Sequence, residues 1–200
     1  MAAGHLCGRW GLSKGKPFPS APQPDPCRHC CGPIGIIAAG ICKFAGARRV
    51  IITDINEYRL ELARKMGVDA AVNTAKEDLR EVMRAQGLTE GFDVGLEMSG
   101  SAAAFHQMIS VMRNGGKISL LGLGGKPIEV DMNTVIWKGL TLQGIYGRKM
   151  DNWHQMSYMV QGGLDVSPVI THRFHYTEFE QGFAAMNSGK SGKVILDWTK

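Results

Sequence analysis

Four residues at the start of the regular part of the chain have the types and order of a phosphate-binding turn. Gly32, Pro33, Ile34 and Gly35 precede an apolar stretch suited to a helix, and residues 50–54 (VIITD) form a short apolar strand. Glycines let a backbone approach a pyrophosphate closely, and the start of a helix offers free N–H groups and partial positive charge. The arrangement matches the second half of a dinucleotide-binding fingerprint.

Asp54 ends that strand, nineteen residues after Gly35, where such fingerprints place the acidic residue that holds the ribose. Its carboxylate can accept hydrogen bonds from both ribose hydroxyls and would repel a 2′-phosphate, so the sequence favours NAD over NADP. Arg59, on the first turn after Asp54, could stack on adenine or contact a phosphate. Two interpretations without a ligand stay open. The glycines could form an ordinary turn between a strand and a helix, and Arg59 could be a solvent-exposed helix residue.

The elements that must position these residues alternate regularly from Gly32 onward. Helices are expected over 34–44, 57–66, 78–86 and 102–112, and strands over 50–54, 70–73, 92–98, 117–122 and 140–146. Short apolar strands separated by helices of about ten residues favour parallel pairing, because parallel strands need a long return connection. The predicted fold class is therefore α/β, a Rossmann-type doubly wound parallel sheet.

The chain is expected to divide into three segments. Residues 1–31 hold five of the eight prolines and four of the five cysteines, and we predict a disordered extension there because proline removes backbone donors. Residues 32–150 are predicted to be the NAD-binding domain. Residues 151–200, with helices expected over 153–161 and 176–186 and strands over 170–174 and 193–198, are too few to bury a core of their own, so they are expected to dock elsewhere.

Charge and composition exclude several classes of function. The net charge of +5 is concentrated in residues 1–31 and forms no basic patch, so we expect no nucleic-acid partner. The sequence shows no apolar run of the length of a signal peptide or a membrane span, and the cysteines do not form a disulfide framework. We therefore predict a cytoplasmic protein with no membrane partner.

Several separate motifs occur in the order and spacing of one enzyme family. They are GPIGIIAAGICKFAGARRVIITDINEYRLELARKMG, FDVGLEMSG, GIYGR and SGKVILDW. Together they resemble the bacterial-type L-threonine 3-dehydrogenases, zinc-containing medium-chain dehydrogenases, over about residues 32–200. The resemblance implies an NAD-dependent oxidoreductase of threonine catabolism that converts L-threonine to 2-amino-3-oxobutanoate, with zinc polarising the alcohol oxygen. It also implies a homotetramer.

The same resemblance implies a row of cofactor contacts. Besides Gly32, Pro33 and Gly35 of the turn, Ile34 would contact the pyrophosphate, and Asp54 and Arg59 the adenosine end. The middle of the cofactor would meet Leu121, Gly122 and Leu123, and its nicotinamide side would meet Ile145 and Tyr146. These last two groups follow predicted strands, where open parallel sheets bind ligands. No catalytic residue and no metal ligand is assigned in this chain.

Two departures from the family pattern lead to further expectations. Cys30 stands where the family has its first glycine, and residues 23–30 (QPDPCRHC) replace an apolar strand, so we predict that the first strand of the sheet is missing. The family's N-terminal catalytic domain, which carries the zinc ligands, has no counterpart in the sequence. Residues 151–200 would belong to that GroES-like domain. The chain is therefore predicted to be a C-terminal fragment that is catalytically incompetent alone.

Other interpretations stay open. The chain could be a nucleotide-binding module without catalysis, or a fragment of a different zinc-type alcohol or polyol dehydrogenase. A zinc or redox site formed by Cys27, His29, Cys30 and Cys31, with His5 or Cys7, is disfavoured because structural zinc needs two well-spaced ligand pairs. The remaining candidates are given structural roles. His106, His172 and His175 are assigned to the surface or to core packing, and Cys42 to a small core position. Trp137, Trp153 and Trp198 are predicted to be packing anchors.

Overall fold

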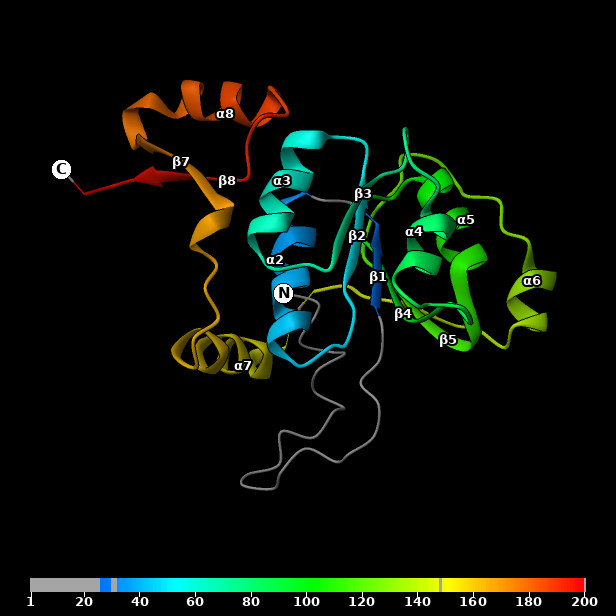
Figure 1. The fold of residues 1–200 in the computed structure, drawn as a ribbon. Coiled ribbons are helices and arrows are strands. Elements are labelled where there is room, and N and C mark those ends of the chain that lie inside the picture. The colour runs from blue at the N-terminus through cyan, green and yellow to red at the C-terminus, as the bar shows by residue number, and fades with distance from the viewer. Residues whose placement is uncertain (1–25, 30–31, 148, 200) are drawn as a thin grey trace.

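The computed structural model describes residues 26–29, 32–147 and 149–199. Its larger unit is a six-stranded sheet in which all neighbouring strands pair in parallel, in the order β3-β2-β1-β4-β5-β6 (Figure 1). The strands are β1 (Pro26–His29), β2 (Ile51–Asp54), β3 (Ala70–Asn73), β4 (Phe92–Glu97), β5 (Met112–Leu120) and β6 (Thr141–Gly144). The strand order reverses between β1 and β4, as in a doubly wound fold, and the predicted fold class is confirmed.

The centre of the sheet overturns one prediction. Residues 23–30 were expected to be unable to form a central strand, yet Pro26–His29 form β1, with Arg28 opposite Ile52 of β2 and Leu96 of β4. The expectation was wrong because Pro26 is the first residue of the strand, where a missing N–H is tolerated. The predicted disorder of residues 1–31 otherwise falls on 1–25, 30 and 31, which lie outside the described residues.

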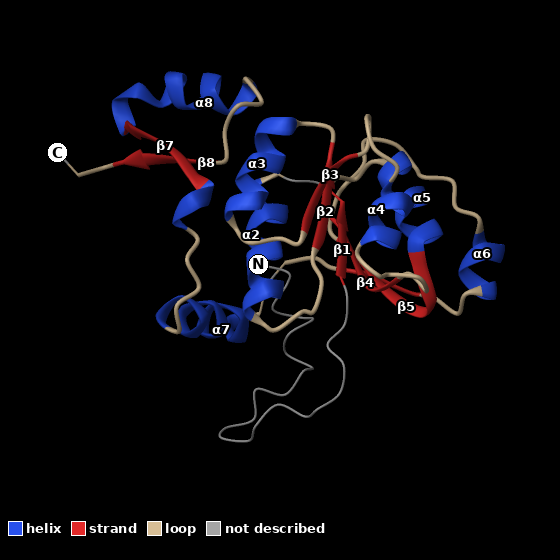
Figure 2. Ribbon diagram, viewed as in Figure 1, coloured by secondary structure: helices blue, strands red, loops and turns tan. Residues whose placement is uncertain are grey.

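Helices cover both faces of this sheet (Figure 2). One face carries α2 (Pro33–Phe44) and α3 (Glu57–Lys65), and the other carries α4 (Leu79–Ala85) and α5 (Ala102–Val111). Ile51 and Ile52 of β2 are both fully buried and belong to different apolar clusters, because successive strand side chains point to opposite faces. Burial of each such side chain contributes about 1.5–3 kcal/mol, so each helical layer is held by the strand beneath it.

Polar side chains define the ends of several helices. Asn56, Asp78 and Asp131 accept hydrogen bonds from backbone N–H groups of α3, α4 and α6 (Met132–Trp137), as N-cap residues do. At the C-terminal end of α5, the Lys138 ammonium donates to the carbonyl oxygens of Ile109, Ser110 and Met112 at 3.0, 2.8 and 2.9 Å. Burial and the nearby charge of Arg80 lower the pKa of Lys138.

A smaller unit follows Gly147. It contains α7 (Met150–Gln161), the 3₁₀ turn Ser167–Val169, β7 (Ile170–His175), a second 3₁₀ turn Tyr176–Glu178, α8 (Phe179–Asn187) and β8 (Lys193–Asp197). Met159 and Leu164 pack against Ala38 and Ile41 of α2, and Val169 is fully buried in the cluster of α2 and α3. This unit is therefore anchored through α7 and the first 3₁₀ turn, while β7, β8 and α8 extend beyond α3 (Figure 1).

Three details differ from the sequence expectations. The short helix α6 was not predicted, since its six residues are rich in β-branched types and its start depends on the Asp131 cap. Trp137 and Trp198 are not packing anchors, because they are 85% and 73% exposed, although the ring of Trp198 stacks on that of Tyr176. Strand β5 starts at Met112, directly after α5, rather than at residue 117.

Within the described part of the chain, no helix is long and apolar enough to cross a bilayer.

Replacing Arg28 by proline tests the central position of β1. Because β1 has a strand on each side, the new residue removes a ladder hydrogen bond, and we expect the free energy of unfolding to fall by about 2 kcal/mol or more. Urea denaturation followed by circular dichroism measures this. The control is Pro26→Ala, which removes no donor and should leave the transition nearly unchanged. An unaltered transition in Arg28→Pro would contradict a central β1.

Candidate functional site

The predicted site residues gather at one edge of the sheet, where the parallel strands end. The turn Gly32–Gly35 follows β1, Asp54 ends β2, Leu121–Leu123 follow β5, and Ile145 and Tyr146 follow β6. The switch point between β1 and β4 lies in the middle of this edge, and open α/β sheets bind ligands there. The structure thus brings together residues that are more than a hundred positions apart in the chain.

The start of α2 offers uncapped backbone donors. Gly32 is the N-cap residue and Pro33 occupies the first turn, and within the described residues no side chain caps this helix. Ile36 N donates to Gly32 O at 3.0 Å, so the N–H groups of Ile34 and Gly35 precede the helical ladder. The first turn also contains no acidic residue. The backbone donors and the helix dipole therefore favour an anion such as a pyrophosphate at this point.

Asp54 presents a rigid carboxylate at the end of β2. Its side chain is 7% exposed, and its Oδ1 accepts hydrogen bonds from the backbone N–H groups of Ile55 and Asn56 at 2.7 and 2.8 Å. Its Oδ2 lies 4.0 Å from Nη1 of Arg59. The carboxylate is thus fixed by its own backbone loop, in the position from which an acidic residue holds a ribose in this fold.

Arg59 has donor capacity that the described residues leave unused. Its Nε is buried, and no hydrogen-bond partner for it is found among the residues that the structure describes. A buried unsatisfied donor costs about 1–3 kcal/mol, so a ligand that bonds this guanidinium would regain that free energy. The adjacent Asn56 accepts from Arg59 N and donates to Gly189 O at 2.8 Å, which ties the loop after β2 to the smaller unit.

The end of β4 contributes residues that sequence reasoning did not single out. Glu97 is 3% exposed and accepts hydrogen bonds from the backbone N–H groups of Ser99 and Gly100, and from the Ser99 hydroxyl. The backbone N–H groups of Leu121 and Gly122 both donate to Glu97 O, at 2.8 and 3.2 Å. The available signal was FDVGLEMSG, a motif noted only for the family resemblance.

Gly122 allows these two strand ends to touch. A Cβ at this position would lie 2.0 Å from Gly100 N and 2.7 Å from Glu97 Oε2, so the backbones pack directly against each other. Gly100 itself has φ +70°, in the left-handed region that favours glycine. The backbone of residues 121–123 is therefore set by this contact.

The rim of the edge is apolar. Leu123 is 88% exposed, Tyr146 97% and Ile34 61%, while Ile145 is partly buried and its N–H donates to Leu120 O at 2.9 Å. Apolar side chains beside a few convergent polar groups are typical of cofactor sites, because bases need flat apolar contacts and phosphates need donors. The edge therefore fits a dinucleotide.

A metal centre does not fit the described residues. Among them, no group of three or more His, Cys, Asp or Glu side chains could hold a metal ion. His106 contacts the carbonyl oxygen of Glu129, His172 stacks on Phe174, and Cys42 packs beside the cluster of α2 and α3. Of the disfavoured cluster, Cys30 and Cys31 lie outside the described residues, whereas Cys27 and His29 belong to strand β1.

A doubly wound parallel sheet with uncapped donors and a fixed carboxylate at its strand ends defines a protein of the dinucleotide-binding α/β class. Residues 33–162 match the zinc-binding dehydrogenase family, and the chain belongs to that family. The resemblance found in the sequence is thereby confirmed at the level of zinc-containing dehydrogenases.

Curated relatives narrow the comparison. The chain is 59% identical over 168 residues to an L-threonine 3-dehydrogenase of Shewanella woodyi, covering 84% of this chain and 49% of that protein. It is 60% identical over 170 residues to an L-threonine 3-dehydrogenase of Aeromonas salmonicida, covering 84% and 50%. The chain spans about half the length of these relatives.

A solved structure shows the same fold. It is a short chain alcohol dehydrogenase of Escherichia coli complexed with NADH, with a TM-score of 0.83 and 20% identity. The match covers 98% of this chain and 56% of that one. The six-stranded sheet unit and the smaller unit after Gly147 are therefore arranged as in a solved structure.

Gly122→Ala tests the close contact between the ends of β4 and β5. The added methyl would meet backbone atoms of Gly100, so we expect the free energy of unfolding to fall by about 1–3 kcal/mol. Chemical denaturation measures this loss. Gly125→Ala is the matched control in the same loop, because nothing lies within 4 Å of a Cβ there. Equal stability of the two variants would mean that the contact is absent in solution.

Proposed function

We propose that this chain is the NAD-binding part of an L-threonine 3-dehydrogenase, an enzyme that oxidises the hydroxyl group of L-threonine to give 2-amino-3-oxobutanoate. One observation carries the proposal: 84% of the chain is 59–60% identical to two proteins of that name. The strand-end edge supports it, because that edge offers a separate feature for each part of a dinucleotide.

The cofactor role rests on the residues of that edge. We assign the pyrophosphate to the uncapped start of α2 (Gly32, Pro33, Ile34 and Gly35), and the adenosine end to Asp54 and Arg59. The middle of the cofactor is assigned to Leu121, Gly122 and Leu123, and the nicotinamide side to Ile145 and Tyr146. NAD, when bound, supplies the hydride acceptor. The fixed carboxylate of Asp54 accepts hydrogen bonds from ribose hydroxyls and repels a 2′-phosphate, which favours NAD over NADP.

The remaining chemistry is assigned elsewhere. The family resemblance places the zinc ligands and the proton relay in a catalytic domain that precedes the NAD-binding domain. Residues 32–150 together with β1 (Pro26–His29) then form the NAD-binding domain, and 151–200 belong to the GroES-like catalytic domain. The 200-residue chain alone is expected to bind NAD without oxidising L-threonine. We further propose a cytoplasmic protein that assembles as a homotetramer and has neither nucleic acid nor a membrane as its partner.

Asp54→Ala tests the cofactor preference. Removing the carboxylate should raise the Kd for NAD about tenfold or more, because charge-assisted hydrogen bonds to the ribose are lost, and should affect NADP less because a repulsion is also removed. Isothermal titration calorimetry with both dinucleotides measures the change. Asp151→Ala, an exposed acidic residue in α7, is the control. Equal weakening of NAD and NADP would refute the assignment of Asp54.

A chimera tests the threonine dehydrogenase proposal. Residues 32–200 replace the matching part of the Aeromonas salmonicida relative, and NADH formation from L-threonine is followed by absorbance. We expect the chimera to oxidise L-threonine with NAD, whereas a chimera carrying Asp54→Ala should need much more NAD. A folded chimera that binds NAD but oxidises other alcohols in preference to L-threonine would contradict the proposed substrate.

A further inference from the structure

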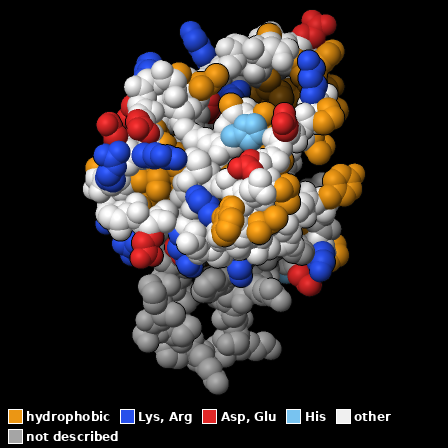
Figure 3. All heavy atoms as spheres, turned by 90° about the vertical axis from the view of Figure 1, so that its right-hand side faces the viewer, with side chains coloured by type: hydrophobic (Ala, Val, Ile, Leu, Met, Phe, Trp, Pro, Cys, Tyr) orange, Lys and Arg blue, Asp and Glu red, His pale blue; other side chains and the backbone are white. Residues whose placement is uncertain are grey.

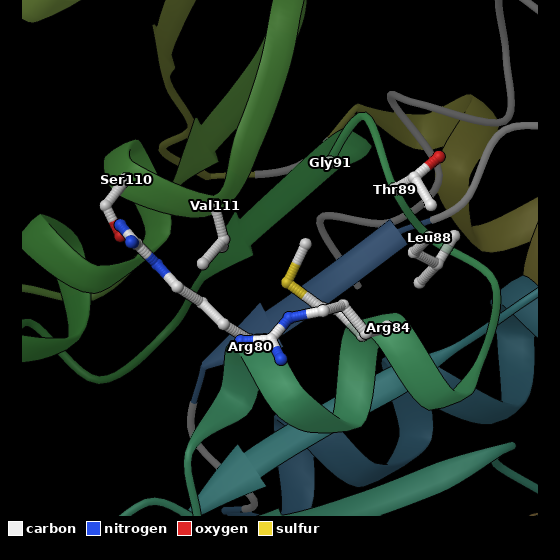
Figure 4. Close-up of a pocket in the computed structure, with 8 residues that line it drawn as sticks. Arg80, Arg84, Leu88, Thr89, Gly91, Ser110 and Val111 are labelled. Atoms are coloured by element: carbon white, nitrogen blue, oxygen red, sulfur yellow. The ribbon is translucent and has the colours of Figure 1, made fainter.

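A hollow lies at the end of the sheet opposite the candidate cofactor edge, where β4 and β5 begin. Its volume is about 430 Å³, within the range of small-molecule sites. It is formed by α4, the loop that leads from α4 to β4, and the end of α5 (Figure 4). The lining residues are Arg80, Met83, Arg84, Leu88, Thr89, Gly91, Ser110 and Val111. None of them belongs to the candidate cofactor edge.

The charge of this hollow has one sign. Arg80 and Arg84 lie one turn apart on α4, and Arg80 extends toward Ser110 and Val111 (Figure 4). The ion pairs formed between described residues include neither arginine, and the lining contains no acidic side chain. Acidic and basic side chains are otherwise interspersed on this side of the molecule (Figure 3).

The end of α5 does not neutralise these arginines either. Its carbonyl oxygens could offset nearby positive charge, but those of Ile109 and Ser110 already accept hydrogen bonds from Lys138. The positive charge of Arg80 is, after burial, the second cause that lowers the pKa of Lys138, because like charges repel each other. An oxyanion placed between α4 and α5 would relieve this repulsion.

The floor of the hollow is apolar and its rim is fixed. Met83, Leu88 and Val111 line the hollow and are 6%, 4% and 4% exposed, so their side chains form an apolar part of its wall. Gly91 has φ +111°, and a Cβ there would lie 2.6 Å from Arg113 N and Val111 O, so the loop runs tightly against the start of β5. The hydroxyl of Thr89 adds a further donor at the rim, whereas the hydroxyl of Ser110 already donates to Gln107 O at 2.8 Å.

We propose that this hollow is a second ligand site, which binds a small oxyanion that carries a short apolar group, such as a phosphate monoester or a carboxylate. The two guanidinium groups hold the oxyanion through paired N–H donors, because the arginine fork matches phosphate and carboxylate geometry. The apolar group rests on Met83, Leu88 and Val111. The site is separate from the cofactor edge and does not depend on the proposed function.

Calorimetric titration with four probes tests this site. Phenyl phosphate and benzoate combine an oxyanion with an apolar ring, inorganic phosphate has only the anion, and benzyl alcohol has only the ring. The full chain is used, with excess NAD present so that the candidate cofactor edge adds no signal. We expect one of the two aromatic anions to bind at least about tenfold more tightly than either single-feature probe. The stronger of the two distinguishes a phosphate site from a carboxylate site.

Arginine variants locate the binding. Arg80→Gln and Arg84→Gln should each raise the Kd of the aromatic anion about tenfold, whereas Arg64→Gln, an exposed arginine of α3 paired with Glu57, should not change it. Circular dichroism melts confirm that the variants fold, which their exposed positions favour. Two results would overturn the proposal: absence of binding by both aromatic anions, or binding that neither α4 variant weakens.

Discussion

The hydrogen-bond ladder of β1 is the constraint on which the candidate site depends. β1 pairs in parallel with both β2 and β4, so its position sets the register between the two halves of the sheet. The start of α2 comes directly after β1, Asp54 ends the neighbour on one side, and Glu97 ends the neighbour on the other. A short central strand therefore determines how far the backbone donors at the start of α2 lie from the carboxylate of Asp54, the two groups to which we assign the pyrophosphate and the ribose.

Close backbone contacts then set the finer geometry of that edge. Glu97 binds the N–H groups of the loop that follows it, and its carbonyl oxygen binds those of Leu121 and Gly122. Only a residue without a side chain fits at position 122, so the ends of β4 and β5 form one rigid platform. On the other side, Asn56 connects the loop after Asp54 to Gly189 of the smaller unit. The edge is thus supported from both flanks by residues that do not themselves need to touch a cofactor.

Much of this arrangement could be predicted from the sequence because it follows periodic patterns. Apolar strands such as residues 50–54 and helices such as α2 show their type locally, and Asp54 was found by its spacing from Gly35. β1 was missed because a single rule about proline was applied to the whole of residues 23–30, whereas only Pro26 lies in the strand, at its first position. The role of Glu97 could not be found from spacing, since its partners are backbone groups brought close only by the fold. The exposure of Trp137 could not be predicted either. Nothing in the sequence shows which face of the short helix α6 packs against the rest of the protein.

The most direct test of the central claim is to map NAD binding on the ¹⁵N-labelled chain by two-dimensional NMR. If the strand-end edge is the cofactor site, the amide signals of Ile34, Gly35, Ile55, Gly122 and Ile145 shift on titration with NAD, while those of Leu88 and Gly91 at the opposite end stay in place. Shifts confined to the opposite end, or no shifts at saturating NAD in a chain that melts cooperatively, would contradict the assignment of this edge.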